Sequence, residues 1–225
     1  MKYKAIIFDF DGILNDTEEI KFNVWKKVTN KKLNRLYYIQ NLCGQSAEFI
    51  AQSYKNKYKL KNSIKDIVLR NKKLAKSILL KNVRPIKENI KFLKECYKLV
   101  NIKIGVASSQ DRAILIPSLR RLKIIKYFHT IIAGHEIKNL KPASDIYLAI
   151  CRKLKVNPEE SVVIEDSQAG VESAYNADIG LIVAVPGYFT KLQDFSKAHI
   201  VIGKKIKPVK GQKHLLSINA IEALF

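Results

Sequence analysis

The sequence predicts an α/β protein in which a Rossmann-like, doubly wound parallel sheet carries an inserted, all-helical cap domain. Two observations support this fold class: short apolar runs alternate with segments of helical periodicity, and one long stretch near the N-terminus shows helical periodicity alone. Several runs are β-branched and apolar on both faces, as expected for strands that helices cover on both sides. The six predicted strands are Tyr3–Phe8, Lys103–Ala107, Thr130–Ala133, Ser161–Ile164, Gly180–Val185 and His199–Ile202.

Helical segments separate most of these runs. Residues 88–99 place Ile90, Leu93 and Tyr97 at helical spacing, and Ser144–Leu154 and Ala169–Ala177 are similar. Strands that alternate with helices in this way indicate a doubly wound α/β domain.

The stretch from residue 18 to residue 83 breaks this alternation directly after the first strand. Its apolar residues recur at helical spacing in 22–28, 49–58 and 64–80. Pro85 marks the exit, because proline begins a new element more readily than it continues a helix. We therefore expect a catalytic core of residues 1–17 and 84–225 and a helical cap of residues 18–83.

The composition limits the class of protein. The chain has 225 residues, of which 47% are hydrophobic, enough for a buried core with one inserted domain. Its three cysteines are widely spaced and form no C-x-x-C pair, so we expect neither a disulfide framework nor a zinc site. The first apolar run is too short for a secretory signal, and no window reaches the roughly 18 apolar residues of a membrane helix. We expect a cytoplasmic protein without a membrane partner, and a monomer.

The formal net charge is +21, but 34 of the 41 basic residues are Lys and only 7 are Arg. Arg is the better reader of phosphates and base edges, and the Lys residues are scattered along the chain. We interpret most of the charge as solvated surface and expect no nucleic-acid partner. A positive field would still attract phosphorylated substrates.

Polar residues follow the predicted strands at the edge where ligands bind in open parallel sheets. The first strand runs into Asp9, Phe10, Asp11 and Gly12. Residues i and i+2 of a strand point the same way, so the two carboxylates can share one site. Asp9 could bind Mg2+ and attack phosphorus while Asp11 carries a proton, although an acidic turn after a strand would look the same.

Three further strand ends extend the pattern. Ser108 and Ser109 could bind a phosphate oxygen, although Ser109 or Asp111 could equally cap the following helix. Lys141 could neutralise a phosphoryl group, although one Lys among 34 carries little weight alone. Asp166 could complete a Mg2+ site with Glu165 as a ligand or a supporting group, or it could cap the next helix. Together these residues supply a nucleophile, a proton carrier, a phosphate donor, a cation and metal ligands.

These motifs resemble those of the haloacid dehalogenase superfamily, in particular phosphatases and phosphomutases with a helical cap. The matching segments are DFDGILNDTE, VASSQ, LKPASDIY and VVIEDSQAGVESA, which span most of the chain. The resemblance implies an aspartyl-phosphate on Asp9, with Asp11 as acid and base and a carbonyl ligand of Mg2+. It further implies that Ser108 and Lys141 hold the phosphoryl group and that Glu165 and Asp166 complete the metal site. Thr17 matches the linker to the cap, near the active site.

The residues around Gly44 bear on the substrate. The beta-phosphoglucomutase branch usually has Lys before this glycine and Arg three residues after it, where this chain has Cys43 and Ala47. Asp11 favours phosphoryl transfer over dehalogenation, and the missing cations favour a phosphatase over a mutase, which remains the alternative. We expect Thr17, Lys21, Gly44, Gln45, Ser46 and Ser109 to bind a small phosphorylated metabolite such as a sugar phosphate.

Two other classes compete with an enzyme. A phospho-receiver domain also combines acidic residues, Ser or Thr and Lys on a parallel sheet, but it is roughly 120 residues long and needs no cap. A basic nucleic-acid binder is supported by charge alone, and a steep salt dependence of binding would favour it.

Overall fold

The computed structural model describes residues 2–30 and 33–202. Its strands form one six-stranded sheet in the order β3-β2-β1-β4-β5-β6, and every neighbouring pair is parallel. The predicted α/β fold class is confirmed. The strands are β1 (Ala5–Phe8), β2 (Lys103–Ser108), β3 (Thr130–Ala133), β4 (Ser161–Glu165), β5 (Leu181–Ala184) and β6 (Ile200–Val201).

The strand order places a crevice next to β1. The chain adds β2 and β3 on one side of β1 and then returns to add β4, β5 and β6 on the other side. The direction of winding therefore switches at β1, and the loops after β1 and its neighbours diverge there. Ligands of doubly wound sheets bind at this point.

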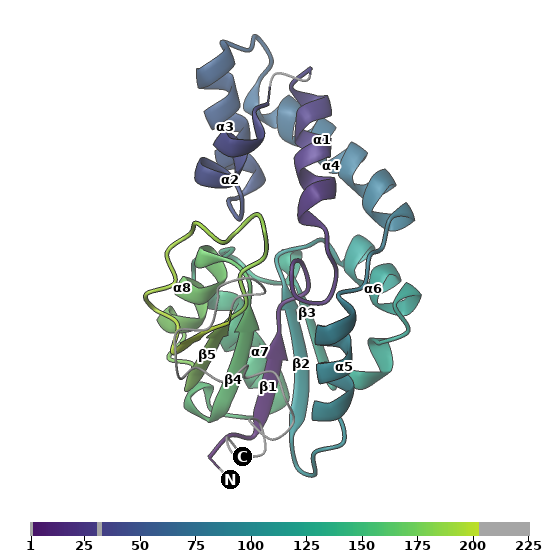
Figure 1. The fold of residues 1–225 in the computed structure, drawn as a ribbon, viewed down its shortest axis with the longest axis vertical. Coiled ribbons are helices and arrows are strands. Elements are labelled where there is room, and N and C mark those ends of the chain that lie inside the picture. The colour runs from purple at the N-terminus through teal and green to yellow at the C-terminus, as the bar shows by residue number, and fades with distance from the viewer. Residues whose placement is uncertain (1, 31–32, 203–225) are drawn as a thin grey trace.

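Helices cover both faces of the sheet (Figure 1). Alternate residues of β1 enter separate cores: Ile6 and Phe8 pack with α5 and α6, whereas Ala5 and Ile7 pack with α7 and α8. All four side chains are at most 1% exposed, which explains the continuous apolar run in the sequence. The helices are α5 (Lys87–Cys96), α6 (Arg112–Arg121), α7 (Asp145–Leu154) and α8 (Gln168–Asn176).

Four helices occupy the interval between β1 and α5, and they stand above the carboxyl edge of the sheet (Figure 1). They are α1 (Glu18–Val28), α2 (Arg35–Asn41), α3 (Ala47–Tyr58) and α4 (Ile64–Lys81). Their apolar faces form a separate core in which the rings of Trp25 and Tyr54 lie 5.5 Å apart. The described residues of this interval contain no strand, as expected. The sequence pattern did not distinguish α2, which Asn34 caps by accepting a hydrogen bond from the Tyr37 backbone.

The two chain segments that enter and leave this helical part lie side by side. Asn15 is 1% exposed, and its side-chain oxygen accepts a hydrogen bond from the Arg84 N–H at 2.7 Å. The Asp16 N–H donates to the Arg84 carbonyl at 2.8 Å. The helical part is therefore joined to the sheet by two connecting segments that are hydrogen-bonded to each other, close to Asp11. Among the described residues, no helix is long and apolar enough to span a membrane.

Tyr54 provides a test of packing in the helical part. Its hydroxyl is buried and has no hydrogen-bond partner among the described residues, whereas the buried Tyr147 hydroxyl donates to Glu165. Tyr54→Phe removes an unsatisfied polar group, so we expect unchanged stability or a gain of up to about 1 kcal/mol. The matched change Tyr147→Phe should lower the free energy of unfolding by about 1–3 kcal/mol, because it takes a donor from a buried carboxylate. Urea denaturation of both variants measures the difference, and a clear loss of stability in Tyr54→Phe would contradict it.

Candidate active site

The carboxyl ends of three adjacent strands bring the central polar residues together. Asp9 follows β1, Ser108 ends β2 and Glu165 ends β4, and both neighbouring strands pair directly with β1. Phe8 lies opposite Val106 and Ile164 in the sheet, so Asp9 emerges level with Glu165, the last residue of β4, and one residue before the end of β2. Parallel strands in register thus place side chains more than 50 residues apart at one edge, as the sequence predicted.

Lys141 joins two of the carboxylates. Its Nζ lies 2.6 Å from Asp9 Oδ1 and 2.6 Å from Glu165 Oε1, and the three side chains are 8%, 9% and 1% exposed. Burial alone would lower the pKa of Lys141, but the Asp9 and Glu165 carboxylates raise it well above its usual range. The two carboxylates therefore hold Lys141 in its charged form beside Asp9.

Glu165 supports the site from beneath. One of its oxygens accepts hydrogen bonds from Lys141 and from the Tyr147 hydroxyl, and the other accepts from the backbone N–H groups of Asp166 and Ser167. A Cβ on Gly170 would fall 1.9 Å from this carboxyl group, so only glycine lets α8 approach it so closely.

Three carboxylates form a candidate metal site. One oxygen from each of Asp9, Glu165 and Asp166 lies within 4.8 Å of the others. Burial raises the pKa of Asp9 to about 8; Lys141 opposes the rise, and Glu165 and Asp11 add to it. Burial and the charges of Glu165 and Asp9 likewise raise the pKa of Asp166 well above its usual range. Hard oxygen donors that repel one another when ionised suit a divalent cation such as Mg2+.

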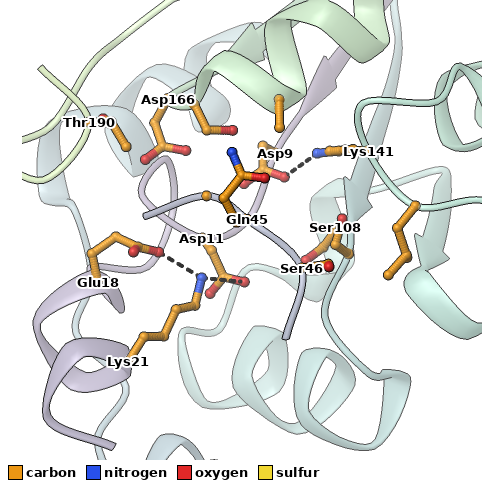
Figure 2. A pocket seen from close by; sticks show the side chains of 15 residues that line it. Asp9, Asp11, Glu18, Lys21, Gln45, Ser46, Ser108, Lys141, Asp166 and Thr190 are labelled. Atoms are coloured by element: carbon orange, nitrogen blue, oxygen red, sulfur yellow. Dashed lines mark hydrogen bonds and ion pairs between the residues drawn. The ribbon is translucent and has the colours of Figure 1, made fainter. Parts of the chain in front are cut away.

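Asp11 lies on the cap side of this group. The Thr17 hydroxyl donates to Asp11 Oδ1 at 2.7 Å. Lys21 Nζ lies 3.4 Å from Asp11 Oδ2 and 2.7 Å from Glu18 Oε1 (Figure 2). Burial would lower the pKa of Lys21, but Asp11 and Glu18 raise it above its usual range. Gly12 has a φ of +81°, and a Cβ there would lie 2.1 Å from Asp166 Oδ2. The turn after β1 thus requires glycine for its conformation and for contact with Asp166.

One pocket gathers most of the predicted residues. It is lined by Asp9, Asp11, Lys21, Gly44, Gln45, Ser46, Ser108, Ser109, Lys141 and Asp166 (Figure 2). Thr17 and Glu165 do not line it, because Thr17 lies behind Asp11 and Glu165 lies beneath Lys141. Gly44, Gln45 and Ser46 belong to the loop between α2 and α3, so the helical part supplies one side of the pocket.

The structure shows which side chains cap the helices that follow β2 and β4. Asp111 caps α6 by accepting a hydrogen bond from the Ala113 N–H, and Ser167 caps α8 by accepting from the Gly170 N–H. Ser108, Ser109 and Asp166 are therefore not used as side-chain caps. Ser108 accepts one hydrogen bond from the Gln110 N–H, which leaves its own O–H for another partner.

Three polar residues that line the pocket were not predicted from the sequence: Glu18, Ser167 and Thr190. Glu18 follows Thr17 directly, so its place in the predicted linker was a usable signal. Thr190 lies after β5, in a segment without any periodic pattern or predicted motif, and its sequence context gave no signal.

The molecule thus combines a doubly wound parallel sheet, a buried Asp9–Lys141 pair at its switch point and a helical insertion after β1, which places it among α/β proteins with a cap. The family model for haloacid dehalogenase-like hydrolases matches residues 6–184. The chain belongs to this family, and the predicted resemblance is confirmed.

Relatives support the same assignment. The chain is 34% identical over 190 residues to a phosphorylated carbohydrates phosphatase of Thermotoga maritima, covering 81% of this chain and 85% of that protein. It is 33% identical over 184 residues to a beta-phosphoglucomutase of Bacillus subtilis, covering 77% and 80%. The crystal structure of CbbY from Rhodobacter sphaeroides in complex with phosphate shares the fold, with a TM-score of 0.76, 23% identity, and coverage of 89% and 93%. The predicted enzyme class, a phosphoric monoester hydrolase, is confirmed.

Proposed function

We propose that this protein is a Mg2+-dependent phosphatase that hydrolyses a small phosphorylated metabolite through an aspartyl-phosphate on Asp9. The observation that carries the proposal is the buried contact of Asp9 with Lys141, beside Asp166 and at the base of a pocket. A carboxylate nucleophile next to a fixed cation suits attack on a phosphate ester, because Lys141 stabilises charge that gathers on the phosphoryl oxygens.

The reaction divides into two steps. Asp9 attacks phosphorus, the bond from phosphorus to the ester oxygen breaks, and Asp11 donates a proton to the departing alcohol. Asp11 then takes a proton from water as the water oxygen attacks phosphorus. The bond to Asp9 breaks, which releases phosphate and regenerates the carboxylate. Thr17 and Lys21 contact the Asp11 carboxyl group, and the Ser108 hydroxyl, which lines the pocket, would donate to a phosphoryl oxygen.

Asp9 and Asp166 would hold the metal through their side chains, and Asp11 through its carbonyl. When bound, Mg2+ would supply positive charge that neutralises the carboxylates and the phosphoryl group. Both oxygens of Glu165 accept other hydrogen bonds, so we assign it chiefly to holding Lys141 and the Asp166 backbone in place.

Metal binding should depend on pH. Burial raises the pKa of Asp9 to about 8, so as the pH falls below this value a proton increasingly competes with Mg2+ for its carboxylate. The apparent affinity for Mg2+ should therefore fall as pH falls, by at least about tenfold per unit below pH 8, and more steeply where Asp166 is protonated as well. Titration calorimetry at pH 6, 7 and 8 measures this dependence. The control Asp166→Asn should weaken binding at every pH, and an affinity independent of pH would contradict the Asp9 assignment.

The charges in the pocket favour a monophosphate with a neutral remainder. Among the lining residues that the structure describes, Lys21 and Lys141 are the cations, and each contacts two carboxylates. The cap side otherwise presents Glu18, Gln45 and Ser46. No free cation among these residues remains for a second phosphate, whereas carboxylate, amide and hydroxyl groups suit sugar hydroxyls. The name of the Thermotoga maritima relative supports a phosphorylated carbohydrate.

A sugar-phosphate mutase is the second candidate, because the Bacillus subtilis relative is a beta-phosphoglucomutase. A mutase must hold a sugar bisphosphate, and the lining residues that the structure describes offer no free cation for its second phosphate. A panel of hexose and pentose monophosphates, matching bisphosphates and phosphoglycolate, tested with Mg2+, separates the two.

We expect release of inorganic phosphate. The value of kcat/KM should be at least about tenfold higher for the best monophosphate than for its bisphosphate, because the second phosphate would be repelled by the Glu18 carboxylate. Gln45→Arg should narrow this ratio by adding a cation. Conversion of one monophosphate into its isomer without net phosphate release would instead identify a mutase.

The domain boundaries at residues 18 and 83, a monomeric state, a cytoplasmic location and the absence of a nucleic-acid partner stay predictions. Residues 203–225 of the predicted core lie outside the described residues.

A further inference from the structure

The segment after β5 reaches from the core into the helical part. Phe189 is 6% exposed and belongs to the apolar cluster of the cap helices. Its ring lies 6.2 Å from that of Phe22 in α1 and 6.1 Å from that of Tyr38 in α2. The Arg35 guanidinium lies 5.5 Å from the Phe189 ring centroid. The core therefore contributes a buried aromatic side chain to the cap.

Gln193, four residues later, makes the polar counterpart of this contact. Its Nε2 donates to the Cys43 carbonyl at 2.7 Å, and its Oε1 accepts from the Gln168 N–H at 2.8 Å. Only an amide in this orientation satisfies both partners, because one is an acceptor and the other a donor. The contact bridges a cap loop and the first turn of α8, segments separated by more than 120 residues in the chain.

Both ends of this bridge adjoin the pocket. Cys43 precedes Gly44, Gln45 and Ser46, which line the pocket from the cap side (Figure 2). A Cβ on Gly44 would lie 3.4 Å from Gln193 Nε2 and 3.6 Å from Ser167 Cβ, so this loop rests directly on the core. Gln168 follows the turn that carries Asp166. One side chain thus links the substrate-facing loop to the proposed metal-binding turn.

The same segment also faces the pocket. Thr190 is 1% exposed, lines the pocket and accepts a hydrogen bond from the Gly187 N–H. A ligand that touches Thr190 would contact the segment between Phe189 and Gln193. The contacts with cap, core and pocket therefore meet within five residues.

We propose that residues 187–193 act as a latch, in which Phe189 anchors the cap and Gln193 is a positioning residue that holds residues 43–46 over Asp9. The proposal rests on the proposed function only in that the pocket binds substrate. Without the Gln193 bridge the loop spends less time against the core, and the population of the binding-competent arrangement falls. Loss of the bridge should therefore lower the affinity for substrate more than it lowers the rate of the chemical step.

Hydrogen exchange and kinetics on the full-length protein test the latch. Gln193→Ala removes both hydrogen bonds, whereas Gln193→Glu retains the acceptor for Gln168 and places a carboxylate against the Cys43 carbonyl. The matched control is Gln52→Ala, which removes an exposed Gln that donates a hydrogen bond to Asn56 on the same helix, α3. Exchange is measured without substrate, so it does not depend on the proposed activity.

We expect amides of residues 40–48 to exchange about fivefold faster in both Gln193 variants and at the parent rate in Gln52→Ala, with β2 unchanged in all three. KM for the best monophosphate should rise about fivefold with kcat within about twofold of the parent. Unchanged exchange in residues 40–48 would overturn the proposal, as would a fall in kcat at unchanged KM. If the parent hydrolyses no phosphate ester, the proposed function fails, and the exchange result still decides whether the latch exists.

Discussion

Asp9→Asn should lower kcat by about 10⁴-fold or more, because the amide is a poor nucleophile and the covalent step depends on the carboxylate. The fold should survive. Asn has nearly the same shape, Glu165 still neutralises Lys141, and the change removes one ionisable group from a cluster of buried carboxyl groups. We expect the melting temperature without metal to stay within about 3 °C of the parent. Steady-state hydrolysis of an aryl phosphate, together with circular dichroism, measures both effects.

Asp11→Asn provides the comparison that separates the two carboxylates. An aryl leaving group needs little protonation, so this variant should still transfer phosphate to Asp9 but fail to activate water. A phosphorylated protein should therefore accumulate in Asp11→Asn and be absent in Asp9→Asn, which intact mass spectrometry after acid quenching would detect. Parent-like turnover in Asp9→Asn would refute the nucleophile assignment.

Lys141→Met should cause the largest loss of stability among the site variants. It leaves Asp9 and Glu165 buried without their cation, and uncompensated buried charge costs about 3–5 kcal/mol. A chain of this size would then melt about 10 °C lower. The loss should grow as pH rises from 6 to 9, because the carboxyl groups can escape the cost only by keeping protons. Activity should fall as well, because the cation beside the phosphoryl group is gone.

Lys153→Met is the matched control for Lys141→Met. Lys153 also pairs with a carboxylate, Glu136, but at 3.2 Å and with 54% of its side chain exposed. Exposed pairs contribute about 0–1 kcal/mol, so its melting temperature should stay near that of the parent at every pH. Equal losses in the two variants would show that burial of Lys141 does not set its contribution.

The helices and strands could be predicted from the sequence because hydrophobic periodicity is a local property of the chain. The continuous apolar runs, such as Ala5–Phe8, reflected burial on both faces of the sheet, and the structure has a strand at each predicted place. The alternation of strands with helices implied parallel pairing, and parallel pairing implied that the residues after each strand share an edge. Asp9, Ser108 and Asp166 could be grouped by this reasoning alone.

The contacts of Lys141 could not be predicted from local sequence patterns. It is one Lys among 34, and it lies in a loop rather than at the end of a strand. The residue pattern gave it little weight alone, and the resemblance to a family strengthened its assignment. Its contacts with Asp9 and Glu165, 132 and 24 residues away, follow from how the loop before α7 folds over β1 and β4.

The sequence by itself determined the fold class, the place of the helical insertion and the edge of the sheet where the acidic residues gather. The tertiary structure decided which side chains support the others: Glu165 beneath Lys141, Thr17 behind Asp11, and Gln193 between the cap loop and α8. The physical reason is the distance along the chain over which each kind of information acts. Hydrophobic periodicity records which face of one element is buried, whereas a hydrogen bond between residues 150 positions apart depends on the packing of every element between them.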